Sequence, residues 1–396
     1  ALLSAMKTDR NVYAPEEDSH LFARFIAALD LADKRVCDMG TGSGILAIAA
    51  AKMGATVTAI DINPHACELA EVNAEAAGVS IKCIHSDLFD RIKETFDVIV
   101  CNAPYLPQDT HDMDEPNATA ITGGKKGHEY SVRFLESAQS HLSEDGSIYL
   151  LFSTLSKPDR ILQAADGLLY DYEKVAEERV FFEQILIYRF WKNETCRKLY
   201  AMGTKNIRDL DRGRHGVIYR AHYRTKDAAI KMAKPKSPSP GSAGKEAFWL
   251  KEVNRLGIGP EFFHYEDGVL LREFVEGRRI NEWIADASPE DARRIIRDVF
   301  EQCRTLDKHH IEKTEMKNPY KHILIGERAV MIDFERCKKS ERPGNVTQLC
   351  EWVCAQQAIL AEKGVIVEPS KLRELARSYK QDMTDENFAR ILDIFE

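Results

Sequence analysis

Polar groups recur at the ends of four successive apolar segments in the first part of the chain. Asp38 ends "RVCD", Asp61 ends "TVTAID", Asp87 follows "IKCIHS" and Asn102 follows "FDVIVC". If these segments are parallel strands, their carboxyl ends meet at one edge of a sheet, where open α/β sheets bind ligands. The pattern therefore predicts a ligand site at that edge.

The type of each group indicates the chemistry it would perform. Glycines in "MGTGSG" allow a tight turn and a close backbone approach to a ligand. A carboxylate at Asp61 can accept hydrogen bonds from two ribose hydroxyls, and Asp87 is well placed to recognise an adenine edge. The predicted set also includes Gly40, Thr41, Gly42, Gly44, Ile62 and Leu88. Dinucleotide enzymes and ordinary βα turns use similar glycines, and Asp61 alone would also serve as a helix N-cap.

The elements that must position these residues alternate between strands and helices, which is typical of a parallel α/β sheet. Predicted strands cover 35–38, 56–60, 81–84, 96–100, 147–152 and 181–188. Predicted helices cover 45–53 and 64–77, the second with Pro64 near its first turn. The rhythm breaks after Trp191, so we expect a domain boundary near residues 190–200.

Within this half, "NAPY" (102–105) resembles the Asn-Pro-Pro-Tyr motif of class I S-adenosylmethionine-dependent methyltransferases that act on amino and amide groups. One position departs, Ala103 for the first proline. The segments "VYAPEEDSHLF" and "ITGGKKGHEYSVRFL" narrow the resemblance to the archaeal and eukaryotic branch of HemK-type protein-glutamine methyltransferases. The resemblance covers residues 10–190 and implies a Rossmann-like domain over 1–192 with a mostly parallel seven-stranded sheet.

That family methylates the glutamine of the Gly-Gly-Gln motif in class I translation release factors, so the resemblance implies the same substrate here. Asn102 would pair with the substrate amide as donor and as acceptor, because an amide nitrogen is a poor nucleophile that must be held in place. Pro104 would hold the backbone rigid, and Tyr105 would pack against the planar amide. Without the first proline, Ala103 keeps its carbonyl but constrains the loop less.

The resemblance also implies how the rest of the site is shared out. Pro15, Glu17, Asp18 and Ser19 would cover the methionine end of S-adenosylmethionine, although they also fit an ordinary capping box. Gly123 and Gly124 would lie in the substrate loop. Eukaryotic relatives work with a small zinc-binding activator protein, which is therefore an expected partner.

The second half, 193–396, resembles a compact kinase of the archaeal type related to the RIO and KEOPS kinases. Gly213 and Gly216 resemble a nucleotide loop, and Lys231 resembles the strand lysine that neutralises phosphates, with Glu246 as its expected partner and Glu252 second. This implies a small bilobal α+β domain that binds ATP, with an N-lobe at about 200–272 and a C-lobe at about 273–396.

The expected catalytic residues of this half depart from the kinase pattern. Asp333 of "DFE" stands where kinases bind magnesium, and Glu315 stands at the position of the catalytic aspartate. The asparagine position holds Lys321 or His322, and a histidine is a poor ligand for magnesium. The predicted metal set is therefore Asp333 with His322.

Composition limits the classes of protein. The chain has 396 residues and a formal net charge of -8, which argues for two domains and against a generic nucleic-acid binder. Residues 192–236 nevertheless hold 13 Lys or Arg against four acids, which predicts either a solvated surface or an RNA contact. The nine cysteines are scattered, no apolar run is long enough to span a membrane, and no signal peptide is apparent, so we expect a cytoplasmic protein.

Three functions remain open on the sequence. The chain is a bifunctional methyltransferase and atypical protein kinase, or a methyltransferase whose second half only binds ATP or RNA. Alternatively, the first half is an N6-adenine methyltransferase acting on nucleic acid, because an adenine amino group fits the same asparagine motif.

Overall fold

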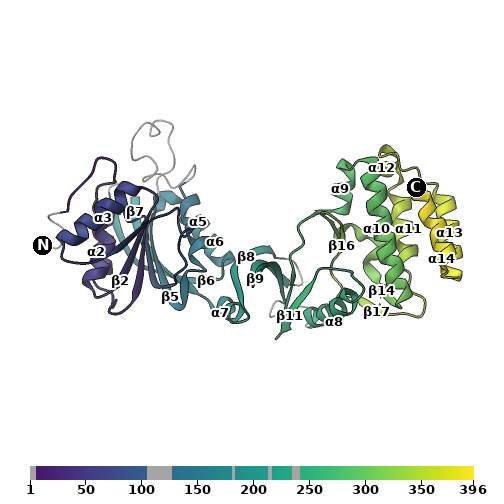
Figure 1. Ribbon diagram of the computed structural model, residues 1–396, viewed down its shortest axis with the longest axis horizontal. Coiled ribbons are helices and arrows are strands. Elements are labelled where there is room, and N and C mark those ends of the chain that lie inside the picture. Colours follow the sequence, from purple (N-terminus) through teal and green to yellow (C-terminus); the bar gives the residue numbers. More distant parts are fainter. Residues whose placement is uncertain (1–5, 105–126, 181–182, 213–215, 234–240) are drawn as a thin grey trace. The chain divides into compact units, whose positions relative to one another are not determined.

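The computed structural model describes residues 6–104, 127–180, 183–212, 216–233 and 241–396 (Figure 1). The predicted residues Tyr105, Gly123, Gly124 and Gly213 lie outside these ranges. The chain divides into two compact units. Unit 1 comprises residues 1–209 and 221–224, and unit 2 comprises residues 210–220 and 225–396.

Unit 1 is built on a seven-stranded sheet with the strand order β3-β2-β1-β4-β5-β7-β6. The strands from β3 to β5 are parallel, while β7 runs antiparallel to both of its neighbours. The strands are β1 (Arg35–Met39), β2 (Thr56–Asp61), β3 (Lys82–His85), β4 (Phe96–Asn102), β5 (Leu142–Ser153), β6 (Tyr170–Val180) and β7 (Glu183–Lys192). The mostly parallel, Rossmann-like sheet predicted from the sequence is confirmed.

Helices pack on both faces of this sheet. They are α1 (Glu17–Ile26), α2 (Ile45–Lys52), α3 (Pro64–Ala76), α5 (Glu129–Ala138), α6 (Pro158–Gly167) and α7 (Glu194–Ala201). Strand β4 explains why the apolar runs are continuous: Val98 and Val100 pack with α1 and α2, whereas Ile99 and Cys101 pack with α5 and α6. A strand that is covered on both faces needs apolar residues at every position.

Unit 1 extends beyond residue 192, where the sequence placed the boundary. The buried side chain of Gln139 accepts hydrogen bonds from the Ile207 N–H (2.6 Å) and the Tyr200 hydroxyl (3.1 Å). Its amide nitrogen donates to the carbonyls of Leu168 (2.7 Å) and Ile207 (2.9 Å). Because a buried amide is costly unless all its groups are bonded, these contacts keep α7 and residues 204–209 with unit 1.

A five-stranded sheet, in the order β11-β12-β10-β9-β8, follows α7. Its strands are β8 (Thr204–Arg212), β9 (Gly216–Tyr223), β10 (Lys226–Ala233), β11 (Phe262–Glu266) and β12 (Val269–Glu273). Helix α8 (Ser242–Asn254) lies between β10 and β11 in the chain and contacts β10, β11 and β12. This sheet and helix occupy the range predicted for an N-lobe.

The rest of unit 2 is mainly helical around one large apolar core. Its helices are α9 (Ile280–Asp286), α10 (Pro289–Lys308), α11 (Asn345–Ala355), α12 (Gln357–Glu362), α13 (Pro369–Gln381) and α14 (Asp385–Leu392). Short strands connect them: β13 (Arg278–Arg279), β14 (Ile311–Lys313), β15 (Ile323–Ile325), β16 (Ala329–Met331) and β17 (Cys337–Lys339). Among the described residues, no helix is long and apolar enough to cross a membrane.

Candidate functional site

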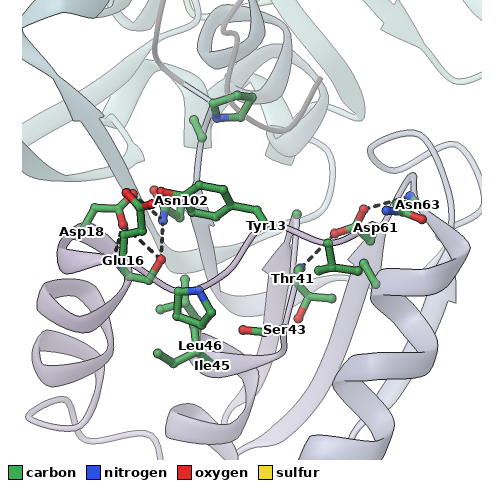
Figure 2. Close-up of a pocket in the computed structure, with 18 of the residues that line it drawn as sticks. Tyr13, Glu16, Asp18, Thr41, Ser43, Ile45, Leu46, Asp61, Asn63 and Asn102 are labelled. Carbon is green, nitrogen blue, oxygen red and sulfur yellow. Dashed lines mark hydrogen bonds between the residues drawn. The ribbon is translucent and has the colours of Figure 1, made fainter. Parts of the chain in front are cut away.

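Unit 1 has a cavity of about 390 Å³ at the carboxyl ends of its parallel strands, a volume suited to a cofactor (Figure 2). It is lined by residues from the segment before α1, from α1, from the glycine turn, and from the ends of β2 and β4. Predicted residues that line it are Pro15, Asp18, Ser19, Gly40, Thr41, Gly42, Asp61, Ile62, Asn102 and Pro104.

The glycine turn gives the cavity a wall of bare backbone. Gly40 and Gly42 have φ of +71° and +52°, the left-handed region that favours glycine. No atom lies within 4 Å of the position that a Cβ of Gly42 would take, so a ligand can approach this backbone closely. Gly44 serves a different purpose, because a Cβ there would meet the Cα of Ala70 at 3.0 Å. It allows α2 to pack against α3 and does not line the cavity.

Asp61 lies at the end of β2, on the cavity wall. Its carboxylate accepts hydrogen bonds from the backbone N–H groups of Gly42 (2.9 Å) and Asn63 (2.8 Å), as Figure 2 shows. Burial raises the pKa of Asp61, and these hydrogen bonds oppose the rise. The carboxylate is thereby fixed beside the glycine turn.

Asp38 shapes the turn from behind and does not line the cavity. One of its carboxylate oxygens accepts hydrogen bonds from the Thr41 hydroxyl (2.7 Å) and the Ala47 N–H (3.0 Å). The other oxygen, Oδ1, is buried and has no hydrogen-bond partner in the described part of the chain. Burial raises the pKa of Asp38 to about 7. Asp38 therefore positions the turn from the protein side.

Asn102 is held at the other end of the cavity, across from Asp61 (Figure 2). Its amide nitrogen donates to the Asp18 carboxylate (3.1 Å) and the Ser19 hydroxyl (3.3 Å), while its oxygen is buried and has no hydrogen-bond partner among the residues that the structure describes. The sequence predicted that Asn102 would pair with a substrate both as donor and as acceptor. The structure differs, because Asp18 and Ser19 already use the donor and leave an acceptor.

Several predicted residues lie away from the cavity lining. Asp87 instead forms an ion pair with Arg133 at 2.5 Å, and Leu88 is buried in the core next to it. Glu17 begins α1 but is not on the wall, where its neighbour Glu16 stands. The acidic pair was recognisable from the sequence, but the geometry at the start of the helix decides which of the two faces the cavity.

Other lining residues were not predicted from the sequence: Asn11, Val12, Tyr13, Glu16, Asn63, Tyr130 and Glu183. Glu183 carries no local motif and reaches this edge because β7 is antiparallel and begins where the parallel strands end. Its side chain accepts a hydrogen bond from the hydroxyl of Ser153, at the end of β5. Such a residue can be identified from the strand topology but not from the spacing of residues in the sequence.

The charge of the lining fits S-adenosylmethionine. The described lining residues include four carboxylates, those of Glu16, Asp18, Asp61 and Glu183, and no Lys, Arg or His. A sulfonium and an ammonium group are stabilised by nearby carboxylates. The bare backbone at Gly42 and the fixed carboxylate of Asp61 suit a ribose at the opposite end.

In unit 2 the structure brings together three of the residues predicted to bind ATP, Lys231, Glu246 and Asp333. Lys231 Nζ on β10 lies 2.5 Å from the Glu246 carboxylate on α8 and 3.6 Å from that of Asp333. A third carboxylate, Glu335, lies at 3.1 Å. Burial alone would lower the pKa of Lys231, but these three negative charges outweigh it and raise the pKa.

The predicted catalytic acid of unit 2 is also in this cluster. The Glu315 side chain lies 3.4 Å from Lys313 Nζ and 3.9 Å from Arg336, and only 8% of it is exposed. Buried Lys313 also donates to the backbone carbonyl of Asp333. His322 Nδ1 is 3.5 Å from the Asp333 carboxylate, but no group of three or more His, Cys, Asp or Glu arranged to hold a metal occurs in the described parts of the chain.

The predicted basic region at 192–236 is less available than its composition indicated. Lys192 is buried, donates to the Leu142 carbonyl (2.8 Å) and lies over the Tyr200 ring, while Lys231 belongs to the cluster above. Arg220 and Lys226 pair with Asp227 and Glu261, each at 2.6 Å. Cations that are buried or paired within the protein contribute little to a phosphate-binding surface.

Comparison with known proteins places unit 1 among methyltransferases. The methyltransferase small domain family matches residues 5–182. The "putative protein N5-glutamine methyltransferase" of Methanocaldococcus jannaschii is 34% identical over 189 residues, which are 47% of this chain and 95% of that protein. The release factor glutamine methyltransferase of Lactococcus lactis is 35% identical over 155 residues, 37% of this chain and 57% of that protein.

A chain solved in the E. cuniculi Mtq2–Trm112 complex, described as responsible for methylating the eRF1 translation termination factor, is 26% identical with a TM-score of 0.38. The match covers 46% of this chain and 99% of that one. The chain spans little more than half, 57%, of the length of the L. lactis release factor methyltransferase. Through unit 1, the chain belongs to the protein N5-glutamine methyltransferase family and carries its methyltransferase small domain.

Proposed function

We propose that unit 1 transfers a methyl group from S-adenosylmethionine to the side-chain amide nitrogen of a glutamine in a protein. The observation that carries this proposal is Asn102. Asp18 and Ser19 hold its amide nitrogen, and within the described part of the chain its buried oxygen is an acceptor without a donor on the cavity wall. An N–H of a substrate amide would satisfy that acceptor, since a buried polar group without a partner costs free energy.

The residues on the wall would hold the cofactor by its two ends. Asp61 would accept hydrogen bonds from the ribose hydroxyls, with the backbone of Gly40 and Gly42 alongside. Glu16 and Asp18 would face the ammonium and sulfonium groups. When bound, the cofactor supplies an electrophilic methyl group beside Asn102.

The protein's part in the reaction is to position the acceptor and to receive its proton. The N–C bond forms as the C–S bond breaks, which releases S-adenosylhomocysteine, and the amide nitrogen loses one proton. By accepting one N–H, Asn102 fixes the orientation of the planar amide, so that the nitrogen faces the methyl group. Glu183 lines the same cavity and is a carboxylate that can take the departing proton toward solvent.

We propose a class I translation release factor as the substrate and the glutamine of its Gly-Gly-Gln motif as the acceptor. The names of the relatives support this choice, as does the resemblance of residues 102–105 to the asparagine motif. The test supplies labelled S-adenosylmethionine and a release factor, with and without the small zinc-binding activator, and locates the methyl group by mass spectrometry. Label on that glutamine, lost in Asn102→Ala, is the expected result, whereas cofactor binding without label there would refute the substrate.

Adenine in nucleic acid is the alternative acceptor, and the lining argues against it. The carboxylates of Glu16, Asp18 and Glu183 stand on the cavity wall, where they would repel backbone phosphates. We therefore expect no salt-sensitive binding of duplex DNA or tRNA in a filter-binding assay. Tight binding that weakens with salt would favour a nucleic-acid substrate instead.

For unit 2 we propose ATP binding, with phosphoryl transfer as the activity that would follow from it. The short ion pair between Lys231 and Glu246, with the Asp333 carboxylate 3.6 Å from the same nitrogen, supports this proposal. Lys231 would neutralise phosphates, Asp333 and His322 would lie nearest a magnesium ion, and Glu315 would orient a hydroxyl. Binding of labelled ATP with magnesium, abolished by Lys231→Met, tests the first step. Autophosphorylation that is unchanged in Glu315→Ala would exclude Glu315 as the catalytic acid.

A further inference from the structure

The segment before α1, residues 6–16, forms one wall of the cavity in unit 1, and we call it the strap. It contributes Asn11, Val12, Tyr13, Pro15 and Glu16 to the lining. The strap contains a turn that begins at Asp9, which accepts hydrogen bonds from the N–H groups of Asn11 (2.7 Å) and Val12 (3.1 Å). The strap belongs to no helix or strand, so side chains from elsewhere must fix it.

Asn73 fixes the start of the strap. It lies in the last turn of α3, on the face that also carries buried Ala70 and Ala74, and is 3% exposed. Its oxygen accepts from the Lys7 N–H (2.8 Å), and its nitrogen donates to the Lys7 carbonyl (3.1 Å). The same nitrogen donates to the carbonyl of Ser43 in the glycine turn (2.9 Å).

One buried carboxamide therefore joins two separate walls of the cavity. A polar group in this apolar position is stable only while its backbone partners are in place, so Asn73 favours the arrangement in which the strap and the glycine turn are both in position. Its partners are backbone groups, and the bonds hold whatever side chains stand at 7 and 43.

Asn63 fixes the strap at a second point, nearer the ribose end. Its nitrogen donates to the Asn11 carbonyl (2.8 Å), and its oxygen caps α3 by accepting from the His65 N–H (3.0 Å). Its backbone N–H bonds to Asp61, and its side chain is labelled on the cavity wall in Figure 2.

We infer that Asn73, assisted by Asn63, is a positioning residue that holds the strap and the glycine turn together as one preformed binding wall for the cofactor. The inference rests on the proposed function of unit 1, because it assumes that the cavity binds S-adenosylmethionine. A site whose wall is already ordered pays less conformational entropy on binding. Loss of the Asn73 hydrogen bonds weakens cofactor binding, mainly by speeding dissociation of the cofactor. It leaves the rate of methyl transfer at saturating cofactor nearly unchanged.

The test uses the full chain and the probes S-adenosylmethionine and S-adenosylhomocysteine. Calorimetry gives affinity, stopped-flow gives dissociation rates, and hydrogen exchange reports the protection of residues 6–16. For Asn73→Ala we expect affinity at least tenfold weaker, about the value of one lost hydrogen bond, with faster exchange across the strap. For Asn63→Ser, which keeps a good helix cap but cannot reach Asn11, we expect a smaller change in the same direction.

Val72→Ala is the matched control, because Val72 is next to Asn73 on α3 but 40% exposed, and it should leave both readouts unchanged. Unchanged affinity and unchanged strap exchange in folded Asn73→Ala would overturn the inference while the proposed function stands. If Asn73→Ala does not fold, Asn63→Ser decides by the same two readouts. A wild-type chain that binds neither probe would overturn the proposed function itself, and the inference with it.

Discussion

The carboxylate of Asp38 is the most strongly perturbed acid in unit 1 for which the geometry supplies a clear cause. It is fully buried, two hydrogen bonds satisfy one oxygen, and no described residue bonds to the other oxygen. Burial moves its pKa from 3.8 to about 7. The folded state therefore holds this proton more tightly than the unfolded state does.

It follows that the apo form of unit 1 loses stability as pH rises from about 4 to about 7, and the loss is complete above the folded pKa. The shift of about three pKa units corresponds to roughly 4 kcal/mol at most. Because a carboxamide cannot ionise, Asp38→Asn should flatten this pH dependence and raise the free energy of opening at pH 7.5 by about 2 kcal/mol. The gain is less than the full amount because the substitution introduces a buried N–H.

Hydrogen exchange of β1 peptides measures that opening in unit 1 alone. Thr41→Val is a useful control, because it removes one hydrogen bond from Asp38 and keeps the carboxylate. The substitution should raise the pKa of Asp38 further, and so the free energy of opening should still fall as pH rises. An Asp38→Asn chain with the wild-type slope would mean that another group titrates.

If unit 2 binds ATP as proposed, Glu335 would compete with the nucleotide for Lys231. Its carboxylate lies 3.1 Å from Lys231 Nζ, the group proposed to meet phosphate. Replacing it by Glu335→Gln removes a negative charge from that position, so ATP should bind about tenfold more tightly, roughly 1.4 kcal/mol. Calorimetry with magnesium and ATP measures the effect. Glu266→Gln, at a 61% exposed carboxylate on β11, should not change the affinity, and a weaker complex with Glu335→Gln would assign Glu335 to ligand binding instead.

At the scale of elements, the turn between β1 and α2 contains two glycines with different roles. Gly42 lines the cavity, whereas Gly44 allows α2 to pack against α3. A Cβ at Gly42 would point into open space, whereas a Cβ at Gly44 would lie 3.0 Å from the Cα of Ala70. We expect Gly42→Ala to cost about 1 kcal/mol of stability, the usual cost of the left-handed region, and to weaken binding of S-adenosylhomocysteine more than tenfold, since its methyl group enters the cavity.

Gly44→Ala should show the opposite balance. The clash of its Cβ with α3, added to a φ of +85°, should cost about 2–3 kcal/mol. Urea unfolding and calorimetry on the two variants separate the effects, provided that both are measured well below the unfolding midpoint. Equal loss of stability in both variants would contradict the distinction.

The sequence was sufficient for elements whose pattern is local. Strands β1, β2 and β4 lie within two residues of their predicted ends, because continuous apolar runs bounded by Gly, Pro or Asp leave little choice. Strand β6 was not predicted, since its residues "YDYEKVAEERV" are polar and mostly exposed at the sheet edge. The short strands β13, β14, β15 and β17 also carry too little pattern to be recognised.

The residues of the site also divide into those that a local sequence pattern predicts and those that depend on long-range contacts. Asp61, Gly42 and Asn102 stand at strand ends and follow from the order of elements. The hydrogen bond that turns Asn102 into an acceptor joins residues 84 positions apart, and no spacing rule reaches that far. Asp87 met the spacing rule, yet it pairs with Arg133, a residue on α5 that is 46 positions away in the chain.

For the whole molecule, the two candidate sites use separate sets of residues in separate units. We therefore expect the functions to be separable in the full chain. Lys231→Met should abolish ATP binding and leave the affinity for S-adenosylhomocysteine within about twofold, because substitutions in sites that share no residues are usually additive. Asn102→Ala should do the reverse, losing methyl transfer and keeping ATP binding. A Lys231→Met chain with altered methyl transfer would reveal coupling between the sites.

The strand order of unit 1 also constrains how the chain is made. Strand β6 pairs with β7, which lies between β5 and β6, so β6 leaves the ribosome before its neighbour in the sheet exists. The sheet is completed only when β7, the last of the three to be synthesised, pairs with both β5 and β6. Glu183 arrives at the cavity in that same step. A chain on a ribosome that stalls before Lys192 therefore has the glycine turn and Asn102 but neither a complete sheet nor a complete pocket. The edge of its unfinished sheet stays exposed and unpaired.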